Sequence, residues 1–391
     1  MHNRISKRRM TGKILAIFPI AYLMMLCTAA RGAVPAETDC PAAFRTYSTA
    51  GTPILDLLLN PETKAIVDRD APGFLAGLPK MLTGGTPPTL ADILTIRQLS
   101  AEGAPLSEEA LDKMDKDLAL VKPTHESAVA RCARYDHTPP ELPAILKHPA
   151  ILVFSKSNGF RDNPSVSAGE AAVNAMAEKE NWTVFSTDNA AVFNAAELKH
   201  FDAVVWNNVS GDVLTLSQRR DFKAYIEKGG GFAAFHGSGG DPYYDWDWYV
   251  DTLIGARFLG HPAAPQFQAA KVKVDDKNDA IVKGLEPEWT MTDEWYSFKS
   301  DPRKKGAHVL LTLDESTYSP MARKNNLRMG DDHPIAWTQC VGNGRSFYAA
   351  IGHRPEGYTE PNTSKLLEQG VAWAAGLGGS SCKGGKEIMK H

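Results

Sequence analysis

The sequence predicts an α/β fold with a mostly parallel sheet and helices on both faces, preceded by a small N-terminal helical module. After residue 148, short apolar runs without polar alternation take turns with amphipathic segments, which is the pattern of βαβ units. Before that residue, apolar positions recur at helical spacing between proline and glycine clusters. A chain of 391 residues, 43% of them hydrophobic, can form one large domain and a smaller one.

Residues 1–36 have the features of a secretory signal peptide. Basic residues precede the apolar run Ile14 to Leu26, and small residues follow it. The run is short for a membrane span, and Leu26 before Cys27 argues against lipid attachment, although an uncleaved anchor remains an alternative. Removing residues 1–32 deletes six positive charges and moves the net charge from −3 to −9, which argues against a nucleic-acid partner. We expect a periplasmic or secreted protein with no stable membrane span after cleavage.

Four cysteines remain after removal of the signal peptide, and no two have the close spacing of a zinc-binding pair. In an oxidising compartment they are expected to form disulfides. Of the three possible connectivities we prefer Cys40–Cys132 with Cys340–Cys382, because each bridge then joins a terminal region to its neighbour.

Residues 37–148 are predicted to form the helical module and a linker. The pattern from Pro53 to Leu120 predicts three short helices, the last of them capped at Ser107. A proline-rich linker follows from Thr138 to Pro149. This segment shows no set of side chains with an evident chemical role.

The α/β domain is predicted over residues 149–378, with a C-terminal tail at 379–391. The stretch from Pro242 to Lys299 is predicted to be irregular and rich in aromatic residues. Strands are expected at 151–154, 183–186, 203–206, 232–235, 309–313, 334–337 and 346–351, and helices at 169–179, 217–228 and 364–375.

The strand from Phe232 to Phe235 delivers His236 onto a glycine turn. The strand lacks polar alternation, as expected for a central strand covered on both faces, and the carboxyl ends of such strands are where open α/β sheets place their sites. Imidazole can act as a base, an acid or a metal ligand, but it is not the usual nucleophile of acyl transfer. The competing interpretation is a buried histidine bound to a backbone carbonyl.

Polar side chains also follow three other predicted strands. Lys156 and Arg161 come after the first, Asn207 and Asn208 after the third, and His353 after the last. These strand ends are expected to converge on one crevice. Lys156 and Arg161 are predicted to anchor the substrate, with solvated surface side chains as the alternative.

Several motifs together carry a family resemblance: 154–156 with 159–161, 211–214, 229–232 leading to His236, 245–249, 260–262, 293–296, 333–334 and 352–353. On these motifs, residues 150–376 resemble the trehalose-utilisation, ThuA-like family. The resemblance implies a flavodoxin-like fold related to the class I glutamine amidotransferases. Asp162 stands where such proteins often carry a histidine, so no role for a histidine there is carried over.

The comparison with amidotransferases also bears on the chemistry. Those enzymes place a cysteine at the strand-end turn where this chain has His236, so the resemblance implies no glutamine amidotransferase activity. The predicted catalytic residues are His236 as central base or ligand, His353 as second acid or base, and Glu294 as their carboxylate partner. The cofactor is unknown; if there is a divalent metal such as zinc, the ligands expected are His236, His261 and Glu294. Turn packing for His261 and an ion pair or helix cap for Glu294 are the alternatives.

Five aromatic residues lie between Tyr243 and Tyr249. Together with the resemblance and the predicted export, they favour a small carbohydrate or glycoside ligand, and Trp246, Trp248, Tyr249 and Tyr296 are predicted to contact it. Packing in the core or in a homo-oligomer is the alternative. We therefore expect a hydrolase, lyase or isomerase that acts on a carbohydrate derivative by acid/base or metal-assisted chemistry. The other hypotheses are a non-catalytic carbohydrate-binding protein and a hydrolase with another nucleophile.

Overall fold

The computed structural model describes residues 38–41, 46–379 and 382. The predicted signal peptide, Cys27 and most of the C-terminal tail lie outside the described residues. The described residues form one compact unit. Among the described helices, none combines the length and the hydropathy needed to cross a membrane.

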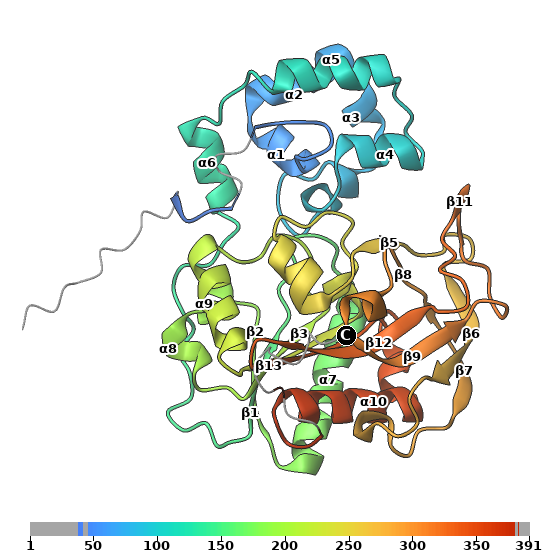
Figure 1. Cartoon of the computed structure of the whole chain (residues 1–391). Helices are drawn as coiled ribbons and strands as arrows, with labels where there is room; N and C mark the ends of the chain where they lie inside the picture. The colour runs from blue at the N-terminus through green and yellow to red at the C-terminus, as the bar shows by residue number, and fades with distance from the viewer. Residues whose placement is uncertain (1–37, 42–45, 380–381, 383–391) are drawn as a thin grey trace, which may run out of the picture. The chain divides into compact units, whose positions relative to one another are not determined.

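A nine-stranded sheet forms the centre of the α/β domain, in the order β2-β1-β3-β4-β13-β12-β9-β6-β7 (Figure 1). The first five strands pair in parallel, in the 2-1-3-4-5 arrangement of flavodoxin-like sheets. The remaining pairings are antiparallel. The strands are β1 (Ala150–Phe154), β2 (Thr183–Thr187), β3 (Ala203–Asn207), β4 (Gly231–Phe235), β6 (Phe267–Val274), β7 (Glu288–Glu294), β9 (His308–Asp314), β12 (Pro334–Val341) and β13 (Gly344–Ala349).

Helices cover both faces of the parallel part, as predicted. Phe347 of β13 packs on Gly370 of α10, where an added Cβ would lie 2.5 Å from the ring. Its neighbour Ser346 points to the opposite face and donates a hydrogen bond to the Leu253 carbonyl of a π-helix, at 2.5 Å. The helices of this domain are α7 (Asn163–Glu180), α8 (Ala195–Leu198), α9 (Leu216–Glu227), the π-helix Trp248–Ile254 and α10 (Pro361–Ala374).

The stretch from Pro242 to Lys299 was expected to be irregular, and this prediction is wrong. It holds the π-helix, β6, β7 and the short pair β5 (Phe258–Gly260) and β8 (Ser297–Phe298). In β6, buried Ala270, Val272 and Val274 alternate with more exposed lysines, as in a strand with one solvated face. The sequence prediction relied on the continuous apolar runs that are typical of parallel strands, so it missed a strand that alternates in this way.

The helical module has its own apolar core, built around Ile54, Ile96 and Met114. Between Pro53 and Leu120 it has five α-helices instead of the three expected there, and a sixth follows at His125–Cys132. The prediction missed helix starts such as Thr95, whose side chain and backbone N–H form a capping box with Gln98. The helices are α1 (Ile54–Leu59), α2 (Pro61–Asp70), α3 (Phe74–Gly77), α4 (Ile96–Glu102), α5 (Glu108–Leu118) and α6 (His125–Cys132).

Buried ion pairs join this module to the α/β domain. Arg131 of α6 bridges Asp56 of α1 and Asp212, and its Nη2 lies 2.8 Å from the Asp212 carboxylate. Arg134 pairs with Asp56 at 2.8 Å and with Asp92. Asp92 in turn accepts a hydrogen bond from the Asp212 backbone N–H at 3.0 Å. Each charge in this network is paired, which is what burial requires.

Both predicted disulfides are confirmed. Cys40–Cys132 joins the segment before α1 to α6, with Cα atoms 5.6 Å apart. Cys340–Cys382 ties the C-terminal segment to β12, with Cα atoms 5.5 Å apart.

Candidate active site

His236 leaves the end of β4 and opens a 3-10 turn over His236–Gly239. Its φ of +34° is unusual for a residue with a Cβ, and such backbone conformations gather at functional sites. Two hydrogen bonds hold it there: Nδ1 lies 3.0 Å from the Ala350 carbonyl, and the Tyr348 hydroxyl donates to the His236 carbonyl at 2.9 Å. Because a carbonyl oxygen only accepts, Nδ1 is the donor of the first bond, and Nε2 is the ring nitrogen that faces Glu294 and His353.

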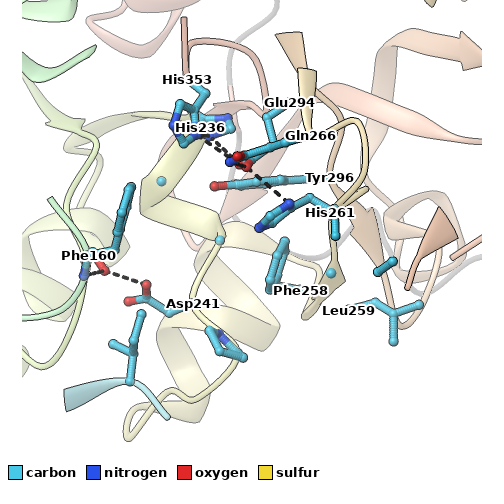
Figure 2. Close-up of a pocket in the computed structure, with 18 of the residues that line it drawn as sticks. Phe160, His236, Asp241, Phe258, Leu259, His261, Gln266, Glu294, Tyr296 and His353 are labelled. Carbon is cyan, nitrogen blue, oxygen red and sulfur yellow. Dashed lines mark hydrogen bonds and ion pairs between the residues drawn. The ribbon is translucent and has the colours of Figure 1, made fainter. Parts of the chain in front are cut away.

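Nε2 of His236 meets one oxygen of Glu294 and Nδ1 of His353 (Figure 2). Glu294 Oε2 lies 3.2 Å from His236 Nε2 and 3.0 Å from His353 Nδ1, and the two ring nitrogens are 3.1 Å apart. The three residues come from the carboxyl ends of β4 and β7 and the loop after β13. The sheet therefore brings together the three predicted catalytic residues, which we call the His-Glu-His cluster.

In the His-Glu-His cluster, the pKa of Glu294 is lowered and the pKa of His353 is raised. Burial alone would raise the pKa of Glu294, but its hydrogen bonds with His236 and His353 hold it well below the usual range. Burial alone would lower the pKa of His353, but the hydrogen bond and charge of Glu294 outweigh this and raise it. Glu294 is therefore a carboxylate across the physiological pH range.

The second oxygen of Glu294 has partners of its own. Oε1 lies 3.2 Å from Nδ1 of His261 and accepts a hydrogen bond from the Gln266 side chain. His261 Nδ1 also lies 2.8 Å from the Pro262 carbonyl. The predicted ligand set therefore differs from the one that the structure gathers, because His353 completes the cluster and His261 contacts the far oxygen of Glu294. Sequence reasoning missed Gln266, which lies in the stretch expected to be irregular.

Asp293 positions the His353 turn beside Glu294. Its side chain accepts hydrogen bonds from the backbone N–H groups of Gly352, at 2.8 Å, and Arg354, at 3.2 Å. These two bonds flank His353 in the chain. Adjacent carboxylates thus have separate tasks: Asp293 holds the backbone of the turn, and Glu294 faces the imidazoles.

A cavity of about 380 Å³ opens over the His-Glu-His cluster. Tyr296, one of the predicted ligand contacts, lines it and stacks on His236 with ring centroids 4.2 Å apart. The polar lining also includes Asp162, Asn208 and Asp241. The Asn208 side chain donates to the hydroxyl of buried Tyr358 at 2.7 Å.

The other five predicted ligand contacts do not line this cavity. Lys156 pairs with Asp136 at 2.5 Å, and Arg161 donates to the Ser155 carbonyl at 2.6 Å. Trp246 and Trp248 pack on each other with centroids 5.1 Å apart, and buried Tyr249 donates to the Ser238 carbonyl at 2.5 Å. The aromatic run packs against the sheet and the helix beside it, as the alternative interpretation holds.

The carboxyl group of Asp241 has a pKa close to neutral pH. Burial raises its pKa to about 7, although hydrogen bonds from the Gly211 N–H and the Ser210 hydroxyl favour its charged form. Because it also lines the cavity, it can give or take a proton near neutral pH.

The raised pKa of Asp241 predicts a loss of stability with rising pH. Between about pH 4 and about pH 7 the folded chain keeps a proton that the unfolded chain has lost, so stability is fully present below this range and falls across it. Asp241→Asn mimics the protonated form and should raise the free energy of unfolding at pH 8 by up to about 4 kcal/mol, since burial raises the pKa from 3.8 to about 7. Chemical denaturation at pH 4.5 and pH 8 checks this: an equal effect at both would contradict it.

Comparison with known proteins gives a family and a fold. The family model described as trehalose utilisation, ThuA, matches residues 150–374, which is more than half of the chain. A solved structure from Bacteroides uniformis, described as ThuA-like, is 23% identical, covers 61% of this chain and 95% of its own, and has a TM-score of 0.50. A second ThuA-like structure, from Parabacteroides merdae, is 17% identical over 63% of this chain and all of its own, with a TM-score of 0.46. A search of curated proteins found no match.

Proposed function

Starting from the fact that the chain belongs to the ThuA, or trehalose utilisation, family, we propose that it is an enzyme that acts on a sugar or glycoside derivative by metal-assisted acid/base chemistry. The observation that carries the proposal is the His-Glu-His cluster, whose three donor atoms lie 3.0–3.2 Å from one another at the bottom of a cavity. Two imidazoles and one carboxylate form one of the ligand sets of catalytic zinc sites, which keep a further position open.

The spacing of these donors suits a small divalent cation. A cation about 2.0–2.2 Å from each donor would see them about 90–105° apart, between octahedral and tetrahedral angles. The contacts of Glu294 Oε1 with His261 and Gln266 hold the carboxylate in orientation, as the outer contacts of metal ligands commonly do. A bound cation would polarise a substrate oxygen or activate water.

The residues around the cluster supply proton transfer and orientation. Asp241, with its pKa near 7, is our candidate for the acid or base that exchanges a proton with a substrate oxygen. Tyr296 covers one face of His236 and keeps the ring in place. This set fits hydrolysis, elimination or isomerisation, but it does not provide the cysteine that glutamine amidotransfer requires.

A panel of glycosides and oxidised sugars, assayed with metal-loaded protein and with chelated protein, tests this function. We expect turnover of at least one compound that disappears on chelation and returns with the metal. Asp241→Asn should lower this turnover while it leaves the bound metal in place. Saturable sugar binding without turnover of any compound would instead favour a carbohydrate-binding protein.

We also propose that the protein is exported to the periplasm or secreted. The two disulfides support this, since such bridges persist in oxidising compartments. The mature chain should lack roughly the first 30–36 residues, as signal-peptide anatomy suggests. Mass spectrometry of the protein from its native compartment checks this, and an intact N-terminus on soluble cytoplasmic protein would contradict it.

A further inference from the structure

The cavity over the His-Glu-His cluster has two chemically different regions. Figure 2 shows His236, His353 and Glu294 close together, with Phe258 and Leu259 lying away from them beyond Tyr296 and His261. The second region is lined by large apolar side chains, which are not needed to hold a metal or a sugar hydroxyl: Leu90, Ile93, Leu94, Phe258, Leu259 and Leu327.

Half of this apolar lining comes from the helical module. Leu90 begins the 3-10 turn Leu90–Asp92, and Ile93 and Leu94 follow it. All three precede residue 150, so they lie outside the part of the chain that the family model matches. The module therefore gives the cavity a wall that family membership alone does not predict.

This wall is fixed to the loops that carry the site. The Thr89 N–H donates to the Asn158 carbonyl, in the loop after β1, at 2.9 Å. Asp92 accepts from the Asp212 N–H in the loop after β3. A Cβ added to Gly159 would lie 2.6 Å from Ile93 Cγ2, so the two segments are in direct contact. The buried ion pair of Arg134 with Asp92 also ties this wall to the end of α6.

Two apolar side chains of the cavity lining that come from the α/β domain are themselves exposed. Leu259 of β5 is 42% exposed and Phe160, in the loop after β1, is 40% exposed. Single exposed apolar residues are common, but these two line the same cavity as the leucines of the module. A ligand with an apolar part would remove this surface from water, and a cavity of about 380 Å³ falls in the range that holds drug-sized ligands.

We infer that the helical module forms an aglycone-binding wall, so that the ligand is a glycoside with an apolar aglycone. The sugar lies at the His-Glu-His cluster, and the aglycone lies between Leu90 and Leu94 on one side and Leu259 on the other. The position of the sugar in this inference rests on the proposed function. The position of the apolar aglycone rests on the lining residues alone.

Titration calorimetry of the full mature chain with paired glycosides tests the wall. The probes are methyl and phenyl glycosides of one sugar, chosen from the panel above, with benzyl alcohol as an apolar probe that lacks a sugar. Phenyl glycoside should bind on the order of tenfold more tightly than methyl glycoside, since burying an aromatic ring is worth that much. Leu90→Ala and Leu259→Ala should each weaken phenyl glycoside about fivefold and leave methyl glycoside unchanged. Leu120→Ala, at an exposed leucine of the module away from the cavity, is the control.

The outcomes separate this inference from the proposed function. Equal affinity for both glycosides, or equal effects of the variants on both, would overturn the wall and leave the sugar site intact. Binding of benzyl alcohol that depends on Leu90 and Leu259, without binding of either glycoside, would overturn the sugar assignment and support the wall. If neither glycoside nor benzyl alcohol binds, both are overturned.

Discussion

Glu294→Gln is expected to abolish turnover and to weaken zinc binding by more than 100-fold. The substitution keeps the side-chain shape but removes the carboxylate charge that faces both His236 and His353. Loss of a group that merely orients a metal ligand typically costs 10- to 100-fold in affinity or activity, so loss of the ligand itself should cost more. Zinc titration with a competing chelator and turnover assays measure the two effects.

Glu288→Gln is the matched control, because Glu288 lies on the same strand, is exposed and pairs with Lys271 at the surface. It should leave metal affinity and turnover unchanged. Circular dichroism and the unfolding midpoint of each variant show whether the fold is kept. Zinc affinity in Glu294→Gln equal to that of the parent chain would remove Glu294 from the metal site.

Arg134→Ala should lower the free energy of unfolding by about 3–5 kcal/mol. Arg134 is buried and pairs with Asp92, whose side chain is fully buried, so the variant leaves that carboxylate without its guanidinium. Arg69→Ala is the comparison, since Arg69 also bridges two aspartates but is 53% exposed, and solvent screens its ion pairs; it should cost much less than Arg134→Ala. Urea denaturation measures both.

Adding Asp92→Asn to Arg134→Ala should recover part of the loss, because the uncompensated charge is then removed. No recovery in the double variant, or equal losses in Arg134→Ala and Arg69→Ala, would show that this buried pair does not stabilise the joint between module and domain. Because Asp92 also ends the turn that carries Leu90, Arg134→Ala should weaken phenyl glycoside binding as well.

The sequence predicts the parallel half of the sheet well, because those strands are covered on both faces and read as unbroken apolar runs. Phe232 to Phe235 is such a run, and it places His236 correctly at the edge where His353 also arrives. The antiparallel strands β6 and β7 are not predicted in this way. β6 alternates buried valines with lysines, and it lies in a stretch dominated by nearby aromatic residues.

Ligand contacts are predicted less well than the cluster, for a physical reason. A strand end fixes where a side chain begins, but not where a long side chain is directed. Lys156 and Arg161 follow β1 as expected, yet both turn to partners outside the cavity, Asp136 and the Ser155 carbonyl. Gln266 and Leu90 line the cavity, and only the pairing of β6 with β7 and the docking of the module bring them there. These long-range contacts have no local signal in the sequence.

The most direct test of the central claim is the metal content of the mature protein, purified without chelators and measured by inductively coupled plasma mass spectrometry. We expect one divalent metal ion per chain, lost in His353→Ala but retained, with weaker affinity, in His261→Ala. That pair separates a ligand from a residue that contacts only the far oxygen of Glu294. No bound metal after zinc loading, or loss of metal in His261→Ala with retention in His353→Ala, would contradict it.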